Sequence, residues 1–274
     1  MSLLDVTDLR VSFPGRGWRA RPVEVLHGVS LSVAPGETLG LVGESGSGKT
    51  TIGRAVLGLV PTSGGDIRFS GSSLIGASPR ERRRLARDIQ VVFQDPYTSL
   101  NPSMTVGDIL AEPLVIQGAT AKDARSRVRT LLDQVGLPAD ASERLPREFS
   151  GGQRQRVAIA RALAPRPRLI VCDEPVSALD LSTQARVLDL FVEIQRATGV
   201  AYLFVSHDLS VVRHISHRVA VLYRGDLVET GPADHVTSAP DHPYTQRLLL
   251  AAPVADPVKQ RSRREQRRQV LEAS

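Results

Sequence analysis

The feature that most constrains this chain is a glycine-rich loop between an apolar run and a helical pattern. Residues 39–51 read LGLVGESGSGKTT, which contains the pattern G-x-x-x-x-G-K-T. Gly43, Gly46 and Gly48 allow backbone conformations that side chains forbid, so successive N–H groups can turn inward around an anion. A helix that begins after Gly48 adds its free N–H groups and the positive end of its dipole. The loop is therefore predicted to bind the phosphates of a nucleoside triphosphate.

Two side chains of this loop have the chemistry to complete such a site. Lys49 can reach the β- and γ-phosphates, and the hydroxyl of Thr50 can ligate Mg²⁺. A chance Gly/Ser turn is a poor alternative, because apolar residues at helical spacing follow the loop. The predicted nucleotide-binding residues of the loop are Gly43, Glu44, Ser45, Gly46, Ser47, Gly48, Lys49, Thr50 and Thr51.

Composition indicates a globular protein of a reducing compartment. The chain has 274 residues and contains no apolar run of about 18 residues that could cross a membrane. Its first residues lack the basic and apolar regions of a secretory signal, so we expect none. Cys172 is the only cysteine, which excludes an internal disulfide and favours the cytoplasm. We expect Cys172 to act as a small buried apolar residue.

The positive charge of the chain is unevenly placed. The formal net charge is +6, and arginines gather at 80–87 while lysine and arginine gather at 259–268. A basic tail can bind nucleic acid or anionic lipid headgroups. It can also be a solvated, disordered end, and we favour this interpretation for residues 256–274 because no aromatic residues are interleaved to stack on bases. Nucleic acid is therefore not expected as a partner.

Apolar patterning predicts an α/β core with a helical insertion. We expect strands at 3–13, 23–33, 66–69, 89–93, 169–172 and 201–205, and a hairpin over 218–230 that turns at 224–226. In the second strand the expected inward residues are Val25, Val29, Leu31 and Val33. Between about 96 and 160 the strand pattern disappears. There Thr105 is predicted to open a helix interrupted at Pro113, and Thr120 another that stops near Gly136. A further helix is expected over 153–164.

Polar residues follow the predicted strands at the edge where open α/β sheets bind ligands. Asp173 ends an apolar strand and can hold the Mg²⁺ that Thr50 also touches, while Glu174 can deprotonate the attacking water. Alone, this acidic pair could merely cap a turn, but the P-loop argues against that. His207 can donate a hydrogen bond to the γ-phosphate. Gln94, expected to end its strand, can contact both the metal and the nucleophile.

Two other segments are candidates for nucleotide contact. Phe13 is an aromatic residue at the end of the first strand, where it could stack on an adenine ring or could simply be a core residue; Trp18 is a weaker rival. Residues 150–153 read SGGQ and form a second small-residue loop that opens a helix, hence a second anion site. One nucleotide does not need two such loops. The simplest geometry has two chains face to face, each closing its second loop on the triphosphate of the other.

Together these motifs resemble the ATPase subunits of ABC transporters, in the family's own order. The matching segments are Walker A at 43–50, the Q-loop at Gln94, the signature at Ser150, Gly151, Gly152 and Gln153, Walker B at 169–174, the D-loop at 177–180 and the H-loop at His207. The resemblance covers residues 3–255. It implies a P-loop NTPase core, with a mixed sheet and an antiparallel β subdomain, as one domain over residues 1–255. It also places Asp180 with the nucleotide, and assigns catalysis to Glu174, His207, Gln94 and Lys49 and Mg²⁺ binding to Thr50, Gln94 and Asp173.

The same resemblance implies a set of partners. They are a second ABC ATPase subunit, identical or different, and two transmembrane permease subunits, with ATP and Mg²⁺ as cofactors. The chain would then lie at the cytoplasmic face of the inner membrane as a peripheral protein.

A narrower resemblance concerns the segments QDPYTSLNP at 94–102 and HPYT at 242–245. They are similar to the dipeptide, oligopeptide and nickel import branch, and Tyr97 is typical of its second, F-type ATPase. This branch implies import of peptides or a related small solute, with a solute-binding protein as an indirect partner. The sequence departs from the pattern at Phe149, where the family most often has leucine, and it lacks the cluster-binding cysteines of some C-terminal extensions. The alternative is a non-transport ABC ATPase in a soluble complex such as phosphonate-degrading machinery.

Overall fold

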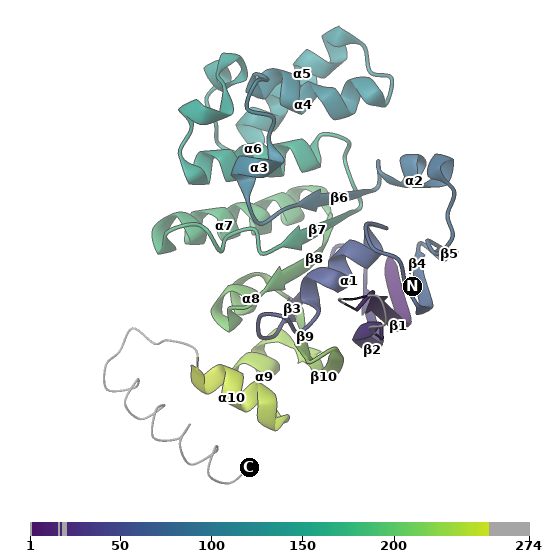
Figure 1. Ribbon diagram of the computed structural model, residues 1–274. Coiled ribbons are helices and arrows are strands. Elements are labelled where there is room, and N and C mark those ends of the chain that lie inside the picture. The colour runs from purple at the N-terminus through teal and green to yellow at the C-terminus, as the bar shows by residue number, and fades with distance from the viewer. Residues whose placement is uncertain (1, 16, 18–20, 252–274) are drawn as a thin grey trace.

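The computed structural model describes residues 2–15, 17 and 21–251, and shows helices and strands layered around two sheets (Figure 1). The predictions for Trp18 and for the basic tail at 256–274 lie outside the described residues. In the described part of the chain, no helix is long and apolar enough to span a bilayer.

The N-terminal strands form an antiparallel sheet in the order β2-β1-β4-β5. Its strands are β1 (Leu4–Phe13), β2 (Val23–Val33), β4 (Gly64–Phe69) and β5 (Ser72–Ser73). The prediction for the inward face of β2 is correct for Val29 and Val33, and Leu31 is partly buried against the same core. It is wrong for Val25, because Leu26 is buried instead. The cause is irregular pairing with β1, because register shifts interrupt the strict alternation of sides.

The larger sheet has the order β10-β9-β3-β8-β7-β6. Its strands are β3 (Thr38–Val42), β6 (Ile89–Val92), β7 (Leu169–Asp173), β8 (Ala201–Ser206), β9 (Arg218–Tyr223) and β10 (Asp226–Pro232). β9, β3, β8, β7 and β6 run parallel, and β10 pairs antiparallel with β9 as the predicted hairpin. The carboxyl ends of the parallel strands therefore share one edge of the sheet.

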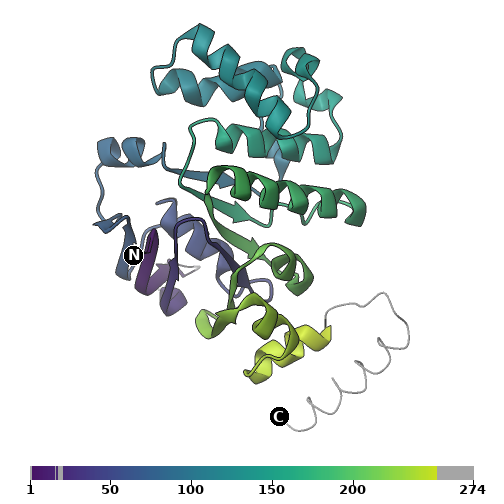
Figure 2. The same ribbon diagram turned by 180° about the vertical axis from the view of Figure 1, so that it is seen from behind.

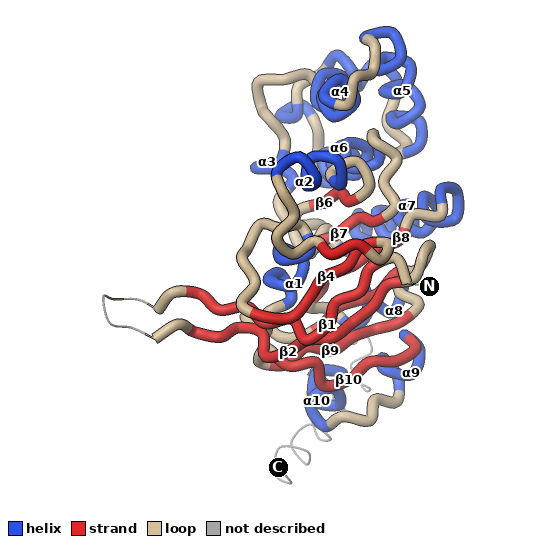
Figure 3. The backbone as a smooth tube through the Cα atoms, turned by 90° about the vertical axis from the view of Figure 1, so that its right-hand side faces the viewer, coloured by secondary structure: helices blue, strands red, loops and turns tan. Residues whose placement is uncertain are grey.

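Both faces of this sheet are covered, which explains why its strands are apolar at nearly every position. Leu169 and Val171 of β7 face a core shared with the antiparallel sheet and helix α1 (Lys49–Val56). Ile170 and Cys172 face the opposite core, with α6 (Gly151–Leu163) and α7 (Leu181–Thr198). Figure 2 shows α7 along that face, and Figure 3 shows β1, β2 and β4 across the other.

The described chain between β6 and β7 contains helices joined by loops and no strand, and these helices gather at one end of the molecule (Figure 1). They are α3 (Pro96–Ser99), α4 (Val106–Ile116), α5 (Ala121–Gln134), 3₁₀ turns at Ala139–Glu143 and Pro146–Glu148, and α6. Thr105 and Thr120 cap α4 and α5 as predicted. The helix expected at 153–164 begins two residues earlier, at Gly151.

The prediction that Pro113 interrupts its helix is wrong. α4 continues through Pro113 to Ile116. Proline removes one helical hydrogen bond and disfavours the preceding turn. Val106, Ile109 and Leu110 are buried in the core that α4 shares with α5 and α6, and we attribute the continuity of the helix to this packing.

The remaining helices complete the layers. α2 (Pro79–Leu85) carries the predicted arginine cluster, and α8 (Leu209–Ile215) follows β8. α9 (Ala233–Ser238) and α10 (Pro243–Ala251) come after the β9–β10 hairpin and pack with α8 and β9 around a third core.

Candidate functional site

The glycine-rich loop joins β3 to α1 and has a backbone that requires glycine at two positions. Gly48 is the N-cap of α1 with φ of 107°, and a Cβ placed on it would lie 2.7 Å from Cδ2 of Leu26. A Cβ on Gly43 would lie 2.1 Å from the carbonyl oxygen of Leu222. The neighbouring strands β2 and β9 therefore leave no room for a side chain at Gly43 or Gly48. The loop follows the carboxyl end of β3.

Lys49 is buried within this loop and points its ammonium group back at the loop. Its Nζ donates hydrogen bonds of 2.8 Å to the carbonyl oxygens of Gly43 and Glu44. Burial lowers the pKa of Lys49, and the nearby carboxylates of Glu174, Asp173 and Glu44 oppose that shift. The Lys49 ammonium group is therefore well placed to bind a strongly negative ligand.

Thr50 and Asp173 meet at the start of α1 and the end of β7. The Thr50 hydroxyl donates a hydrogen bond of 2.9 Å to Oδ1 of Asp173. Burial raises the pKa of Asp173, while Thr50 and the charge of Arg54 oppose this shift. A hydroxyl and a carboxylate are oxygen donors of the kind that Mg²⁺ prefers, so the pair fits this ion.

Glu174 and His207 form the next pair along the sheet edge. Nδ1 of His207 lies 3.0 Å from Oε2 of Glu174. The Glu174 side chain is 17% exposed and that of His207 57%, so the pair opens to solvent on the histidine side. Glu174 has φ of 48°, a left-handed conformation that is costly for a residue other than glycine. Its N–H donates to the carbonyl of Val205, which ties the backbone of this residue to β8.

A cavity of about 390 Å³ brings nine of the predicted residues together, although Asp173 and His207 are not part of its lining. Phe13, which is 36% exposed, lines this cavity together with Gln94 and Glu174. The structure places Gln94 two residues beyond the end of β6, so the prediction that it ends the strand is wrong. The cavity is lined by Phe13, Val25, Ser45, Gly46, Gly48, Lys49, Thr50, Thr51, Gln94 and Glu174.

The second predicted loop does not line this cavity. Ser150 is the N-cap of α6, and it exchanges hydrogen bonds with Gln153 in a capping box. A Cβ on Gly152 would lie 2.3 Å from Cγ2 of Thr183, so the start of α6 packs closely against α7. Asp180 is the N-cap of α7. The segments at 150–153 and 180–183 thus form one surface, separate from the P-loop.

Hydrogen bonds at this surface also stabilise the ionised form of the Asp180 carboxyl group. Its carboxylate accepts from the Ser182 hydroxyl at 2.7 Å and from the Thr183 N–H at 3.0 Å. The bonds from Thr183 and Ser182 hold the pKa of Asp180 well below its usual range.

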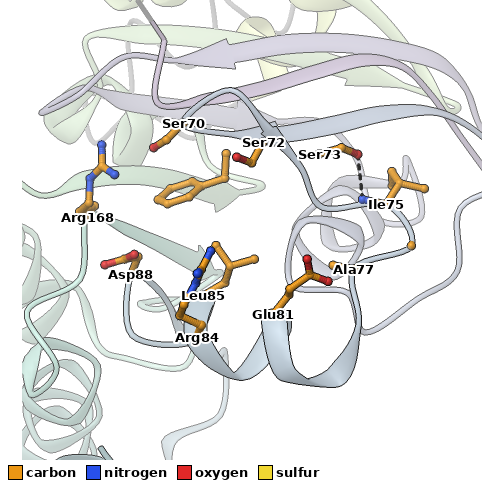
Figure 4. A pocket seen from close by; sticks show the side chains of 12 residues that line it. Ser70, Ser72, Ser73, Ile75, Ala77, Glu81, Arg84, Leu85, Asp88 and Arg168 are labelled. Atoms are coloured by element: carbon orange, nitrogen blue, oxygen red, sulfur yellow. Dashed lines mark hydrogen bonds between the residues drawn. The ribbon is translucent and has the colours of Figure 1, made fainter.

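Another cavity, of about 400 Å³, shares no lining residue with the first. Figure 4 shows Ser70 and Ser73 from the β4–β5 hairpin on one side of it and Glu81 and Arg84 of α2 on the other. Arg168 lies over the ring of Phe69 at 5.4 Å. No predicted site residue lines it.

Two residues near the P-loop were not predicted from the sequence. Val25 lines the cavity because the β1–β2 register turns it there, and irregular pairing has no local sequence signal. Tyr244 accepts a hydrogen bond of 2.9 Å from the N–H of Glu44. The HPYT segment stands out in the sequence, but nothing in it indicates contact with a loop so distant along the chain.

Three histidines away from the P-loop take part in structural contacts. His27 and His214 pair with Asp226 and Asp189, and Nδ1 of His217 accepts from the N–H of Thr38. In the part of the chain that the structure describes, one group of potential metal ligands lies outside the P-loop region. It consists of Glu229, His235 and Asp241, with ligand atoms within 4.8 Å of one another.

Comparison with known proteins gives two matching family models. The sequence model of the family "ABC transporter" matches residues 26–177, and that of the "Oligopeptide/dipeptide transporter, C-terminal region" matches residues 228–274. The chain is 51% identical over 267 residues to the glutathione import ATP-binding protein GsiA of Escherichia coli (strain K12), covering 96% of this chain and 43% of that protein. The GsiA of Shigella dysenteriae serotype 1 is 54% identical over 245 residues, covering 89% and 39%. The chain thus spans about two fifths of the length of these relatives.

Solved structures show the same fold. The chain is similar to cbiO1 from Clostridium perfringens, described as part of the ABC transporter complex cbiONQ, with a TM-score of 0.77, 26% identity and coverage of 87% of this chain and 91% of that one. It is also similar to a dimeric ATP-binding cassette in a post-hydrolysis state with ADP and Pi, with a TM-score of 0.75, 27% identity and coverage of 84% and 98%. The chain therefore belongs to the ABC transporter family.

Proposed function

We propose that this chain binds and hydrolyses ATP and thereby powers import of a peptide or a peptide-like solute such as glutathione. The observation that carries the proposal is the cavity in which the P-loop, Gln94 and Glu174 meet. The names of its relatives, which refer to glutathione import and to oligopeptide and dipeptide transport, support the choice of solute.

The proposed roles follow from the chemistry of each group. Lys49 and the N–H groups of residues 43–51 hold the phosphates, and Phe13 stacks on the adenine. Thr50, Asp173 and Gln94 would hold Mg²⁺, which would neutralise phosphate charge. Glu174 accepts a proton from the attacking water, and His207, at 3.0 Å from Glu174, orients that carboxylate and donates toward the γ-phosphate.

We further propose that the site is completed by a second ABC ATPase subunit, identical or different. The start of α6 and Asp180 form a surface that does not line the chain's own P-loop cavity. Free N–H groups at the start of a helix attract anions, so this surface suits the triphosphate held by another subunit. The helices over about 96–160 would then transmit closure of the pair to two permease subunits at the cytoplasmic face of the membrane.

The test is coupled phosphate release in a reconstituted complex. The complex is reconstituted in liposomes from this chain, the second ATPase subunit, two permeases and the solute-binding protein. Phosphate release is then measured with the solute-binding protein empty or loaded with glutathione or a dipeptide. We expect a loaded binding protein to stimulate release several-fold and labelled solute to accumulate. Phosphate release that is independent of permeases, in a soluble complex with other enzymes, would instead support the non-transport alternative.

A further inference from the structure

The first peptide group of the P-loop is held at both ends. The carbonyl oxygen of Gly43 accepts a hydrogen bond of 2.8 Å from Nζ of Lys49. The N–H of Glu44, which belongs to the same peptide group, donates a bond of 2.9 Å to the hydroxyl of Tyr244. With both its acceptor and its donor engaged, this peptide has one orientation, and that orientation directs its carbonyl at the lysine.

Tyr244 is itself rigidly placed beside the loop. It lies in the first turn of α10 and is 2% exposed. Its ring packs against that of Tyr223, with centroids 4.1 Å apart. Tyr223 directly follows Leu222, the residue whose carbonyl oxygen closes off the side-chain position of Gly43. The end of β9 and the start of α10 therefore lie against the same corner of the P-loop.

The turn before α10 is fixed by a carboxylate on β10. Oε1 and Oε2 of Glu229 accept hydrogen bonds from the N–H groups of Asp241 and His242, at 2.9 and 3.2 Å. Nδ1 of His242 in turn accepts from the N–H of Tyr244 at 3.2 Å. This series of contacts sets the position of the tyrosine ring relative to the sheet.

We propose that Tyr244 is a positioning residue for nucleotide binding, whose hydroxyl holds the Gly43–Glu44 peptide in the orientation that the loaded P-loop needs. The inference rests on the proposed ATP-binding function. A loop already ordered before its ligand arrives loses less conformational entropy on binding, so this contact strengthens affinity without touching the nucleotide. Burial raises the pKa of Tyr244 further above the physiological range, where the hydroxyl is neutral.

The test compares Tyr244→Phe with Tyr223→Phe in the full chain. Each variant removes one hydroxyl from the same pair of rings, but only the Tyr244 hydroxyl bonds to the P-loop among the described contacts. Affinity for MgATP is measured by calorimetry, and exchange of the Glu44 amide hydrogen is measured without nucleotide. For Tyr244→Phe we expect faster exchange at Glu44, binding weaker by about three- to tenfold, and a raised KM for ATP with kcat within about twofold. Tyr223→Phe should match the wild type.

The outcomes separate this inference from the proposed function. If Tyr244→Phe binds MgATP as well as the wild type, or if Tyr223→Phe weakens binding equally, the positioning role is overturned. If the wild type itself does not bind MgATP while Tyr244→Phe still speeds exchange at Glu44, the contact stands and the proposed function fails. Glu229→Gln is a second variant that acts through the turn before α10. It should shift exchange and affinity in the same direction as Tyr244→Phe, and no shift in either would count against the inference.

Discussion

The hydroxyl of Thr50 donates a hydrogen bond of 2.9 Å to the carboxylate of Asp173, across 123 positions of the chain. The bond joins the first turn of α1 to the end of β7 and brings two oxygen ligands together at the edge of the sheet. It is the geometric core of the proposed Mg²⁺ site, and it forms because β3 and β7 are both paired with β8.

Glu174→Gln should separate ATP binding from turnover. Glutamine keeps the shape of the side chain but cannot accept a proton, so phosphate release should fall by about 10²–10⁴-fold while MgATP affinity changes little. Size-exclusion chromatography with ATP should then show a trapped, ATP-bound dimer. The matched control is Glu193→Gln, at an exposed position of α7. Hydrolysis by Glu174→Gln at the normal rate would remove Glu174 from its role.

His207→Ala should lower kcat more than it affects affinity. The imidazole contacts Glu174 at 3.0 Å and is expected to orient that carboxylate. Its hydrogen bond to the γ-phosphate is expected to be stronger in the transition state than in the bound state, so its loss lowers kcat more than affinity. We expect a loss of about tenfold or more in phosphate release at saturating ATP. His214→Ala is the control, because His214 pairs with Asp189 on an exposed helix face. Equal losses in the two variants would contradict a specific role for His207.

Asp173→Asn and Asp180→Asn should change stability in opposite directions. Burial raises the pKa of Asp173, so the unfolded state loses its proton first and the ionised carboxylate subtracts from the free energy of unfolding at neutral pH. Hydrogen bonds lower the pKa of Asp180, so its carboxylate adds stability that is lost as pH falls. At pH 7 we expect Tm to rise in Asp173→Asn and to fall in Asp180→Asn, with both differences shrinking in acid. For the partly buried Asp173, a change of about 1 kcal/mol would shift Tm by about 2–4 °C in a chain of roughly this size.

The Asp173→Asn variant contains its own control. The amide oxygen introduced by Asp173→Asn would still accept the bond from Thr50. A fall in Tm for this variant could therefore not be explained by loss of that contact and would contradict the burial argument. The same variant should nevertheless lose Mg²⁺-dependent phosphate release. Stability gained with activity lost is the expected signature of a desolvated functional carboxylate.

Phe13→Ala should weaken ATP binding without affecting binding of inorganic triphosphate. Stacking of a base on an aromatic ring contributes about 1–3 kcal/mol, so the loss for ATP should be roughly 5- to 150-fold. Val23→Ala is the control, because Val23 pairs with Phe13 on the neighbouring strand and is exposed. If both ligands weaken equally, Phe13 supports the loop rather than the adenine.

Much of the fold could be predicted because its signals are local. Thr105 and Thr120 mark helix starts, and the apolar runs at 169–172 and 201–205 are strands within a residue of their predicted bounds. The prediction for Pro113 is wrong because a local rule for helix interruption does not include the buried face of α4. The prediction for Val25 is wrong because the register shifts of β1 and β2 depend on pairing between strands.

The residues of the candidate site can likewise be separated into those with a local sequence signal and those without one. The P-loop, Asp173, Glu174 and His207 are recognisable because each lies at the end of a strand or just beyond it, and parallel strands deliver their ends to one edge. Tyr244 is 200 positions from Glu44, and only the packing of α10 against β9 brings its hydroxyl to the loop. Such a contact has no counterpart in local spacing.

The most direct test of the account is equilibrium binding of MgATP to the wild type and to Lys49→Ala, measured side by side by calorimetry. Lys122→Ala serves as the control, because Lys122 is exposed on α5. Loss of the buried ammonium should weaken binding by at least about tenfold, while the control binds like the wild type. Equal affinity of Lys49→Ala and wild type, or no binding of MgATP by any of the three, would contradict the central claim that this glycine-rich loop holds a nucleoside triphosphate.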